Sequence, residues 1–120
     1  MLARLIAAAL ELPRTDPGDA PEPEGISSAV LKALHPRLAC LPINLYRVAF
    51  VPTDLDAQPG MAAVTDDLQD IYSDLQDGLW LYGLGYVDAA AWHWDLHFES
   101  HWGHHASDAL HALQGHAAQA

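Results

Sequence analysis

Two histidines near the C-terminus, His101 and His105, have the i, i+4 spacing of paired metal ligands on one face of a helix. Asp108 follows within one turn, borders both imidazoles and would supply a third, carboxylate ligand. Asp67 and Asp74 belong to a separate helical segment, and either could complete the set, as facing helices do in bundle metal centres. The sequence therefore predicts a candidate divalent-metal site at these five residues.

The same residues have a second interpretation, a buried His–Asp network, and this is the one we favour. Such networks are purely structural in many proteins, because a buried imidazole needs a carboxylate or carbonyl partner. Both interpretations require Asp67 or Asp74 to lie within hydrogen-bond distance of His101 or His105.

The other reactive residue types give little support for catalysis. His93, His97, His104 and His111 fall within about 40° of one another on a helical projection, and we expect them on a separate, more polar face. Cys40 is the single cysteine, which excludes an intrachain disulfide and a thiolate zinc site. These residues offer no nucleophilic triad, which argues against covalent catalysis and leaves open whether the protein is an enzyme.

Two long helices must position the candidate ligands. Apolar residues at helical spacing predict one helix over Asp66 to Leu84, capped by Thr65, and another from Asp88 to about Gln114. Because their connection is short, we expect antiparallel packing. The predicted apolar stripes are Val64, Leu68, Ile71, Leu75, Leu79 and Tyr82 in the first helix, and Trp94, Phe98, Trp102, Ala109 and Leu113 in the second.

Side chains outside these stripes give two further predictions. Asp67 and Asp74 lie along the edge of the first stripe and should be partly buried, whereas Asp70 and Asp77 should point further toward solvent. Trp80 and Trp92 point away from the stripes, which predicts a second packing surface: a homodimer contact or a site for a protein partner.

The first half of the chain is less regular. Met1 to Leu12 predicts an amphipathic helix, and Ser27 or Ser28 caps a short one that Pro36 ends or kinks. Residues 13–25, with four prolines and five charges, predict a surface linker outside the core. For residues 41–63 we expect irregular chain or one short helix. The predicted fold class is all-α: one domain over residues 1–120, a small bundle of about four helices with a long C-terminal helix.

The distribution of charge restricts the partners. All five Lys and Arg residues precede position 48, whereas the rest of the chain holds eleven acidic side chains and seven of the eight histidines, so the formal charge of −11 arises there. Such a surface repels phosphate backbones, which argues against nucleic acid. The sequence also lacks the roughly 18 apolar residues of a membrane span. We expect a cytoplasmic protein with a solvated acidic surface; a binder of a basic partner is an alternative.

The chain also resembles a bacterial family of unknown function with the pattern DLxDIYxDLxxGLxLY…WxWxxxFExHWGxHxxDAL. The matching residues are Asp67 to Leu75, Gly78-Leu79, Leu81-Tyr82, Trp92 to Trp94, Phe98-Glu99, His101 to Gly103, His105 and Asp108 to Leu110. Leu5 to Pro13 and the stretch from Tyr46 to Pro52 fit as well, so the resemblance covers most of the chain. It implies a small helical cytoplasmic protein and no particular mechanism.

These observations predict an interaction or accessory module that uses the two long helices. The competing class is a metal-binding protein or metal-dependent hydrolase built on His101, His105 and Asp108 with Asp67 or Asp74.

Overall fold

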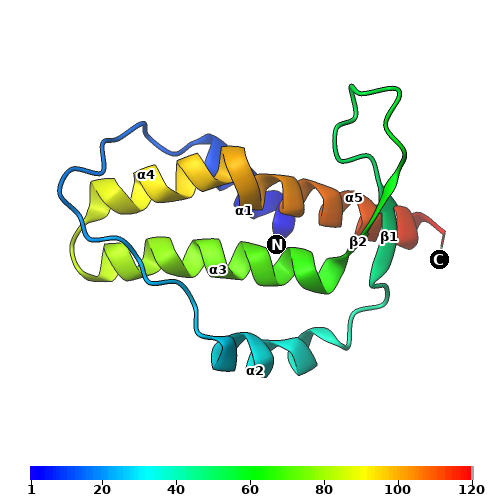
Figure 1. The fold of residues 1–120 in the computed structure, drawn as a ribbon, viewed down its shortest axis with the longest axis horizontal. Coiled ribbons are helices and arrows are strands. Elements are labelled where there is room, and N and C mark those ends of the chain that lie inside the picture. The colour runs from blue at the N-terminus through cyan, green and yellow to red at the C-terminus, as the bar shows by residue number, and fades with distance from the viewer. Residues whose placement is uncertain (120) are drawn as a thin grey trace.

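The computed structural model describes residues 1–119, and the two longest helical segments form its centre. The elements in chain order are α1 (Leu2–Leu10), α2 (Ser28–Leu38), β1 (Leu45–Val48), β2 (Gly60–Ala63), α3 (Val64–Gly83), α4 (Val87–His97), the π turn η1 (Phe98–Trp102) and α5 (Gly103–Ala118). Because α4, η1 and α5 follow without a break, they form one long C-terminal helix, which runs antiparallel to α3 (Figure 1). The predictions of a long last helix and of antiparallel packing are confirmed, and the predicted all-α class holds for most of the chain.

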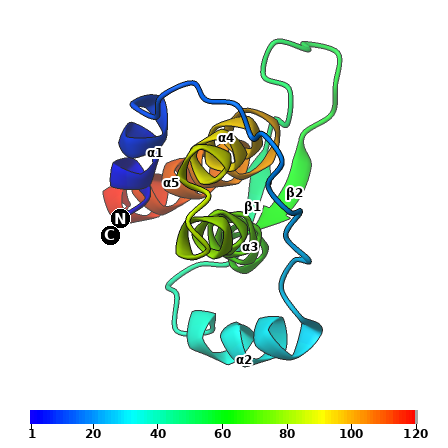
Figure 2. The same cartoon turned by 90° about the vertical axis from the view of Figure 1, so that its left-hand side faces the viewer.

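The core lies where α3, α1 and the long helix meet. α1 and α2 flank this central pair on different sides, α1 against α5 and α2 against α3 (Figure 2). Small side chains on α5 let α1 approach closely, and the Trp102 indole fills the remaining space at 2% exposure. The buried cluster consists of Leu2, Ala9, Ile71, Trp102, Ala106 and Ala109.

The predicted apolar stripe of α3 holds only over its first three turns. Val64 and Ile71 are buried, but Leu79 and Tyr82 are half exposed. Leu81 is buried in their place, in a second small cluster beside the turn that joins α3 to α4. The prediction is wrong at these two positions because the start of α4 covers the Leu81 side of α3 instead.

Residues 41–63 form a β-hairpin, where we predicted irregular chain or a short helix. β1 and β2 pair antiparallel, with Leu45 opposite Ala63 and Val48 opposite Gly60. Each strand has only four residues, too few for a clear alternation of apolar and polar side chains, and prolines precede and interrupt the segment. Within residues 1–119, this hairpin is therefore the departure from the predicted all-α class.

The first turn of α3 is capped from outside the helix. We predicted Thr65 as N-cap of a helix that begins at Asp66, but α3 begins two residues earlier, at Val64, and Asn44 supplies the acceptors. The Asn44 backbone carbonyl accepts from the Val64 N–H at 2.9 Å, and its side-chain oxygen accepts from the Thr65 N–H at 3.1 Å. This cap fixes the hairpin to the turn that carries Asp67.

The linker over residues 13–25 is held against the long helix. The Thr15 hydroxyl donates to the Asp88 backbone carbonyl at 2.6 Å. Ala20 packs on the cluster around Leu81 and Ala89, so the linker does contribute one small side chain to the core, contrary to prediction. Of the other caps, Ser27 accepts from the Val30 N–H as predicted.

The π turn widens the long helix by one residue at its middle. The Gly103 N–H donates to the Phe98 carbonyl, five residues earlier, instead of to the fourth. Side chains donate to backbone carbonyls on both sides of this interruption: His97 to His93, Ser100 to Leu96, Trp102 to Trp94 and His104 to Glu99.

None of the helices within residues 1–119 combines the length and the apolar character that a membrane span requires.

Gly103→Ala should destabilise the protein by about 1–3 kcal/mol, the usual cost of overpacking. A Cβ at this position would run into the Phe98 carbonyl oxygen, which is the acceptor of the π turn. Gly115→Ala is the matched control, because nothing lies near a Cβ there and alanine is the better helix former by about 1 kcal/mol. Urea unfolding of both variants measures the difference, and equal effects would show that the π turn imposes no constraint.

Candidate functional site

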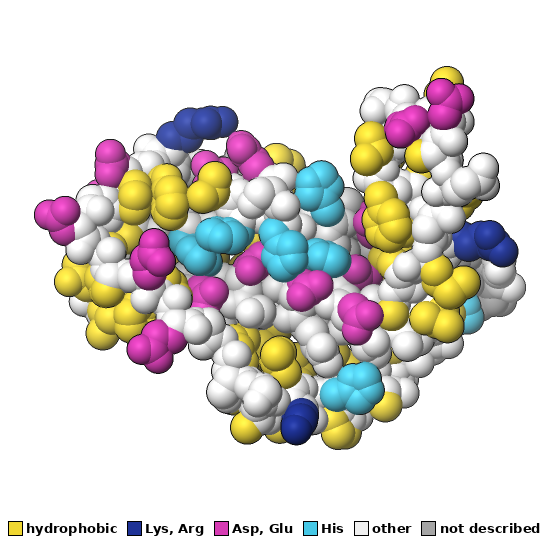
Figure 3. Space-filling view, in the orientation of Figure 1, with side chains coloured by type: hydrophobic (Ala, Val, Ile, Leu, Met, Phe, Trp, Pro, Cys, Tyr) yellow, Lys and Arg dark blue, Asp and Glu magenta, His cyan; other side chains and the backbone are white. Residues whose placement is uncertain are grey.

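A row of carboxylates on α3 faces a row of imidazoles on the long helix. Figure 3 shows histidine and acidic side chains side by side along this face. The aspartates are spaced by three and four residues and the histidines by four. We call these eight residues the His–Asp row: Asp67, Asp70, Asp74 and Asp77, with His93, His97, His101 and His105.

The row contradicts our prediction that His93 and His97 occupy a different face from His101 and His105. In a regular helix the 12 residues from His93 to His105 leave the two side chains about 120° out of phase. The extra residue in the π turn removes about 100° of that difference. His104 and His111, also placed with His93 by prediction, are exposed.

Two histidines of the row make short hydrogen bonds to buried carboxylates. His101 Nδ1–H donates to Asp74 at 2.6 Å, and His105 Nδ1–H donates to Asp67 at 2.7 Å. The predicted contact between these residues is therefore confirmed, as is the burial of both aspartates. Asp67 also accepts a hydrogen bond from the hydroxyl of Tyr46 in β1, so the hairpin contributes to the site.

Asp70, which we predicted to point toward solvent and not to the site, is a site residue. Its carboxylate lies 3.1 Å from His105 Nε2, and one ligand atom each from Asp70, His101 and His105 lie within 4.8 Å of one another. Asp108, predicted as the third ligand, is not in this group, although it lines the same pocket. The signal was in the spacing, since Asp70 follows Asp67 by three residues and precedes Asp74 by four.

The group of three opens into a pocket of about 590 Å³. The first half of α3 and the middle of the long helix form one wall, and the hairpin with its loop forms the other. The loop side is apolar, with Phe50, Val51 and Met61, whereas the helical side carries the carboxylates and imidazoles. A ligand at this position would reach solvent through the pocket.

At the end of the row next to the hairpin, the neighbouring carboxylates favour the charged form of the His105 imidazole. The hydrogen bond to Asp67 raises the pKa of His105, with a further contribution from the Asp70 charge, although burial opposes it. Burial raises the pKa of Asp108, and the neighbouring Asp67 charge adds to it. Burial, and then the hydrogen bond to Asp67, raise the pKa of the Tyr46 hydroxyl, which therefore stays protonated as a donor.

The other end of the row is incomplete. His93 is buried, its ring stacks on His97 at 3.9 Å between centroids, and its Nε2 has no hydrogen-bond partner among the described residues. Asp77 lies 3.9 Å away, too far for a hydrogen bond. Burial lowers the pKa of His93 to about 4, and the His97 charge adds to it. Burial and the Asp74 charge raise the pKa of Asp77.

The fold and the site together define a class of small helical protein. Its long C-terminal helix is interrupted by a π turn and contacts α3 through the His–Asp row. The chain belongs to a family described as a domain of unknown function, DUF5063, whose model matches residues 1–119. The predicted resemblance to a family of unknown function is thus confirmed. The crystal structure of protein BF1032 from Bacteroides fragilis is similar with a TM-score of 0.73 and 21% identity, over 94% of this chain and 68% of that one. This likeness shows the fold alone. No curated protein matches the chain.

The free energy of unfolding, measured with a chelator present, should depend on pH in opposite directions at the two ends of the row. His93 has a folded pKa below its unfolded value of about 6.5, so its contribution is complete above that pH and is lost as the pH falls toward about 4. His105 has a raised folded pKa, so its contribution is complete below about pH 6.5 and is lost as the pH rises through the folded pKa.

Urea unfolding between about pH 4.5 and 8.5 tests both signs. His93→Gln should flatten the acid side of the profile and His105→Gln the alkaline side. His116→Gln, at an exposed position in the last turn of α5, is the control and should leave the profile unchanged. An acid side that stays as steep in His93→Gln as in the wild type would contradict the buried neutral imidazole.

Proposed function

We propose that the protein binds a divalent transition-metal ion through Asp70, His101 and His105. Two imidazoles and a carboxylate are a ligand set that zinc and related ions accept. The observation that carries the proposal is the convergence of these three side chains on one point at the mouth of a pocket. The 3.1 Å between His105 Nε2 and Asp70 is close to the separation of about 3.4 Å between two ligand atoms of a tetrahedral zinc ion.

The carboxylates behind the imidazoles support this assignment. Asp74 and Asp67 hold the Nδ1–H of His101 and His105, which fixes each ring and leaves Nε2 as the nitrogen for a ligand. Histidines that bind metals are commonly oriented by a carboxylate in this way. In the metal-free protein Asp70 accepts from the second N–H of a charged His105 ring, and the same carboxylate is in place as a ligand when a metal ion replaces that proton.

The arrangement leaves room for a fourth ligand. Three protein ligands with one position open to a pocket are typical of catalytic rather than structural zinc sites. In the metal-free protein a proton on His105 Nε2 faces Asp70, so a metal ion must displace it. The same site thus supports the alternative of a metal-dependent hydrolase, with Asp108 in the pocket as a second carboxylate rather than a ligand.

Zinc titrated into untagged, chelator-treated protein near neutral pH should bind with one ion per chain. Asp70→Asn and His105→Gln should each weaken binding by at least about tenfold, and Asp74→Asn by about 10- to 100-fold through loss of ring orientation. Calorimetry in two buffers of different ionisation enthalpy should show release of the His105 proton.

His104→Gln is the matched control for the metal titration. His104 is exposed and lines the same pocket, but it lies outside the group of three. If zinc binds the Asp70→Asn and His105→Gln variants as tightly as the wild type, the ion is held by surface histidines and the proposed site is wrong.

A second observation favours the predicted interaction module. Large apolar side chains are exposed together where α3 turns into α4: Leu79, Trp80, Tyr82, Leu84, Tyr86 and Val87. We propose that this turn surface contacts a second copy of the chain, which is the predicted homodimer contact. Trp92, predicted as part of it, is instead half-buried and lines a pocket under the linker.

Sedimentation equilibrium should show dimers at high protein concentration, and Leu84→Glu should reduce them by placing a charge in the contact. Leu55→Glu is the control, because Leu55 is 91% exposed on the hairpin loop, away from the turn surface. A wild-type protein that stays monomeric throughout would exclude the homodimer.

We also propose a cytoplasmic location. Cys40 is an exposed free thiol, the only cysteine of the chain, and this fits a reducing compartment.

A further inference from the structure

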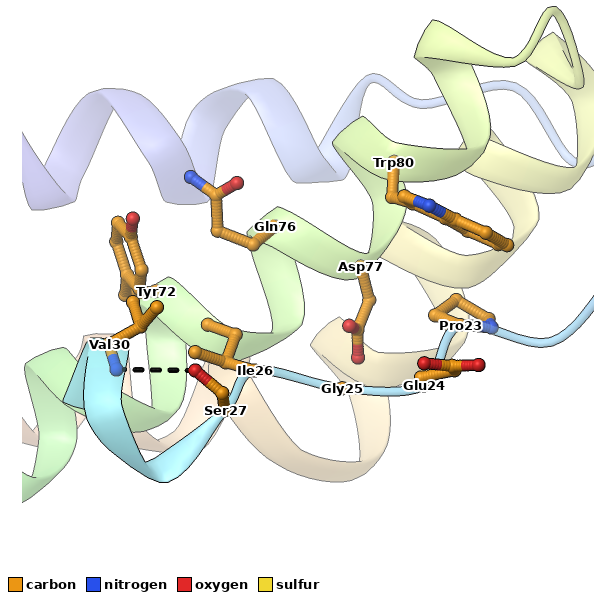
Figure 4. Close-up of a pocket in the computed structure, with 10 residues that line it drawn as sticks. All are labelled: Pro23, Glu24, Gly25, Ile26, Ser27, Val30, Tyr72, Gln76, Asp77 and Trp80. Atoms are coloured by element: carbon orange, nitrogen blue, oxygen red, sulfur yellow. Dashed lines mark hydrogen bonds between the residues drawn. The ribbon is translucent and has the colours of Figure 1, made fainter.

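A second cavity, of about 590 Å³, lies between α3 and the segment that leads into α2. Figure 4 shows its lining: Tyr72, Gln76, Asp77 and Trp80 come from α3, and Pro23 to Ser27 and Val30 face them. The Asp77 carboxylate points from the helix toward the segment around Gly25, and the Trp80 ring lies beside Pro23. This cavity is separate from the proposed metal pocket and shares no residue with it.

Two carboxylates, Asp77 and Glu24, line this cavity, and among residues 1–119 no lysine or arginine pairs with Asp77. Neither lysine nor arginine lines the cavity, and none follows position 47 in the sequence. The nearest basic atom is His93 Nε2, at 3.9 Å. The neighbouring charges are those of Asp74 on the same helix, His97 on α4 and Glu24 on the facing segment. Asp77 is thus a largely buried carboxylate in a negative field.

His93 lies on the other side of Asp77, in the neighbouring pocket under the linker, and its Nε2 is 3.9 Å from the Asp77 carboxylate, too far for a hydrogen bond. His93 is more than nine-tenths buried, and its Nε2 has no hydrogen-bond partner among the described residues. Unpaired buried polar atoms are rare because each costs free energy. A cation on the far side of Asp77 would hold this carboxylate ionised, and His93 Nε2–H could then donate to it after a small shift.

We propose that this cavity binds an ammonium or guanidinium group carried on an apolar stem, with Asp77 as its counter-ion and Trp80 as its aromatic wall. The carboxylate accepts the N–H donors, and Glu24 adds negative charge at the side. A cation over an indole gains further stabilisation, and the stem packs against Pro23 and Val30. The group comes from a free small cation or from an arginine side chain of a peptide.

The experiment is an NMR and calorimetric titration of the whole chain with butylguanidinium, with a chelator present so that the outcome does not depend on the proposed metal site. Butylguanidinium should bind and shift the His93 ring signal. Asp77→Asn should weaken binding by at least about tenfold, the usual effect of a charge-assisted pair, and Trp80→Leu by about 2- to 30-fold. Asp66→Asn is the control, since it removes the same charge from an exposed position of α3 outside the cavity.

Two further ligands distinguish the outcomes. Butanol has the stem without the charge and should bind much more weakly than butylguanidinium. The peptide acetyl-Gly-Arg-Gly-amide separates the sources: comparable binding assigns the cavity to an arginine of a partner, and binding of butylguanidinium alone assigns it to a free small cation. Equal binding of butanol and butylguanidinium, or of butylguanidinium to wild type and a folded Asp77→Asn, would overturn the proposal. Circular dichroism establishes the folding of each variant.

Discussion

The alignment of all four histidines of the His–Asp row with α3 depends on the π turn at Phe98–Trp102. Imidazoles spaced by four residues drift around a regular helix, so the histidines before and after the turn would face different neighbours. The extra residue cancels most of this drift and keeps all four on the side of α3. The glycine at position 103 permits the π turn, because the Phe98 carbonyl oxygen lies where any other residue would place its Cβ.

The row differs in chemical state from one end to the other. At the hairpin end His105 lies between two carboxylates and carries a raised pKa, whereas at the turn end His93 is buried, its pKa is lowered, and its Nε2 has no hydrogen-bond partner within residues 1–119. Both proposed ligands are cations for the same reason. The chain places eleven acidic groups after position 47 without one lysine or arginine, so histidines are the only basic side chains there that face the carboxylates, and the surface attracts cations.

The two long helices and their contact were predictable, because each carries a local signal. Apolar periodicity gave α3 to within two residues, and the spacing of Asp67 and Asp74 indicated their burial. The hairpin was not predictable. Its four-residue strands have little periodicity of their own, and what holds them is the pairing with each other and the Asn44 cap on α3. Contacts between distant segments leave no such pattern in the chain.

By itself, the sequence determined the residue types of the site and the element that carries each one. Helical phase along α3 is regular, so the edge on which Asp67 and Asp74 lie follows from counting residues. Only the tertiary structure decided which histidines meet them, and that Asp70 rather than Asp108 joins His101 and His105. The physical reason is the π turn: one backbone hydrogen bond, from Gly103 to Phe98, resets the phase of the long helix, and no side-chain pattern records that bond.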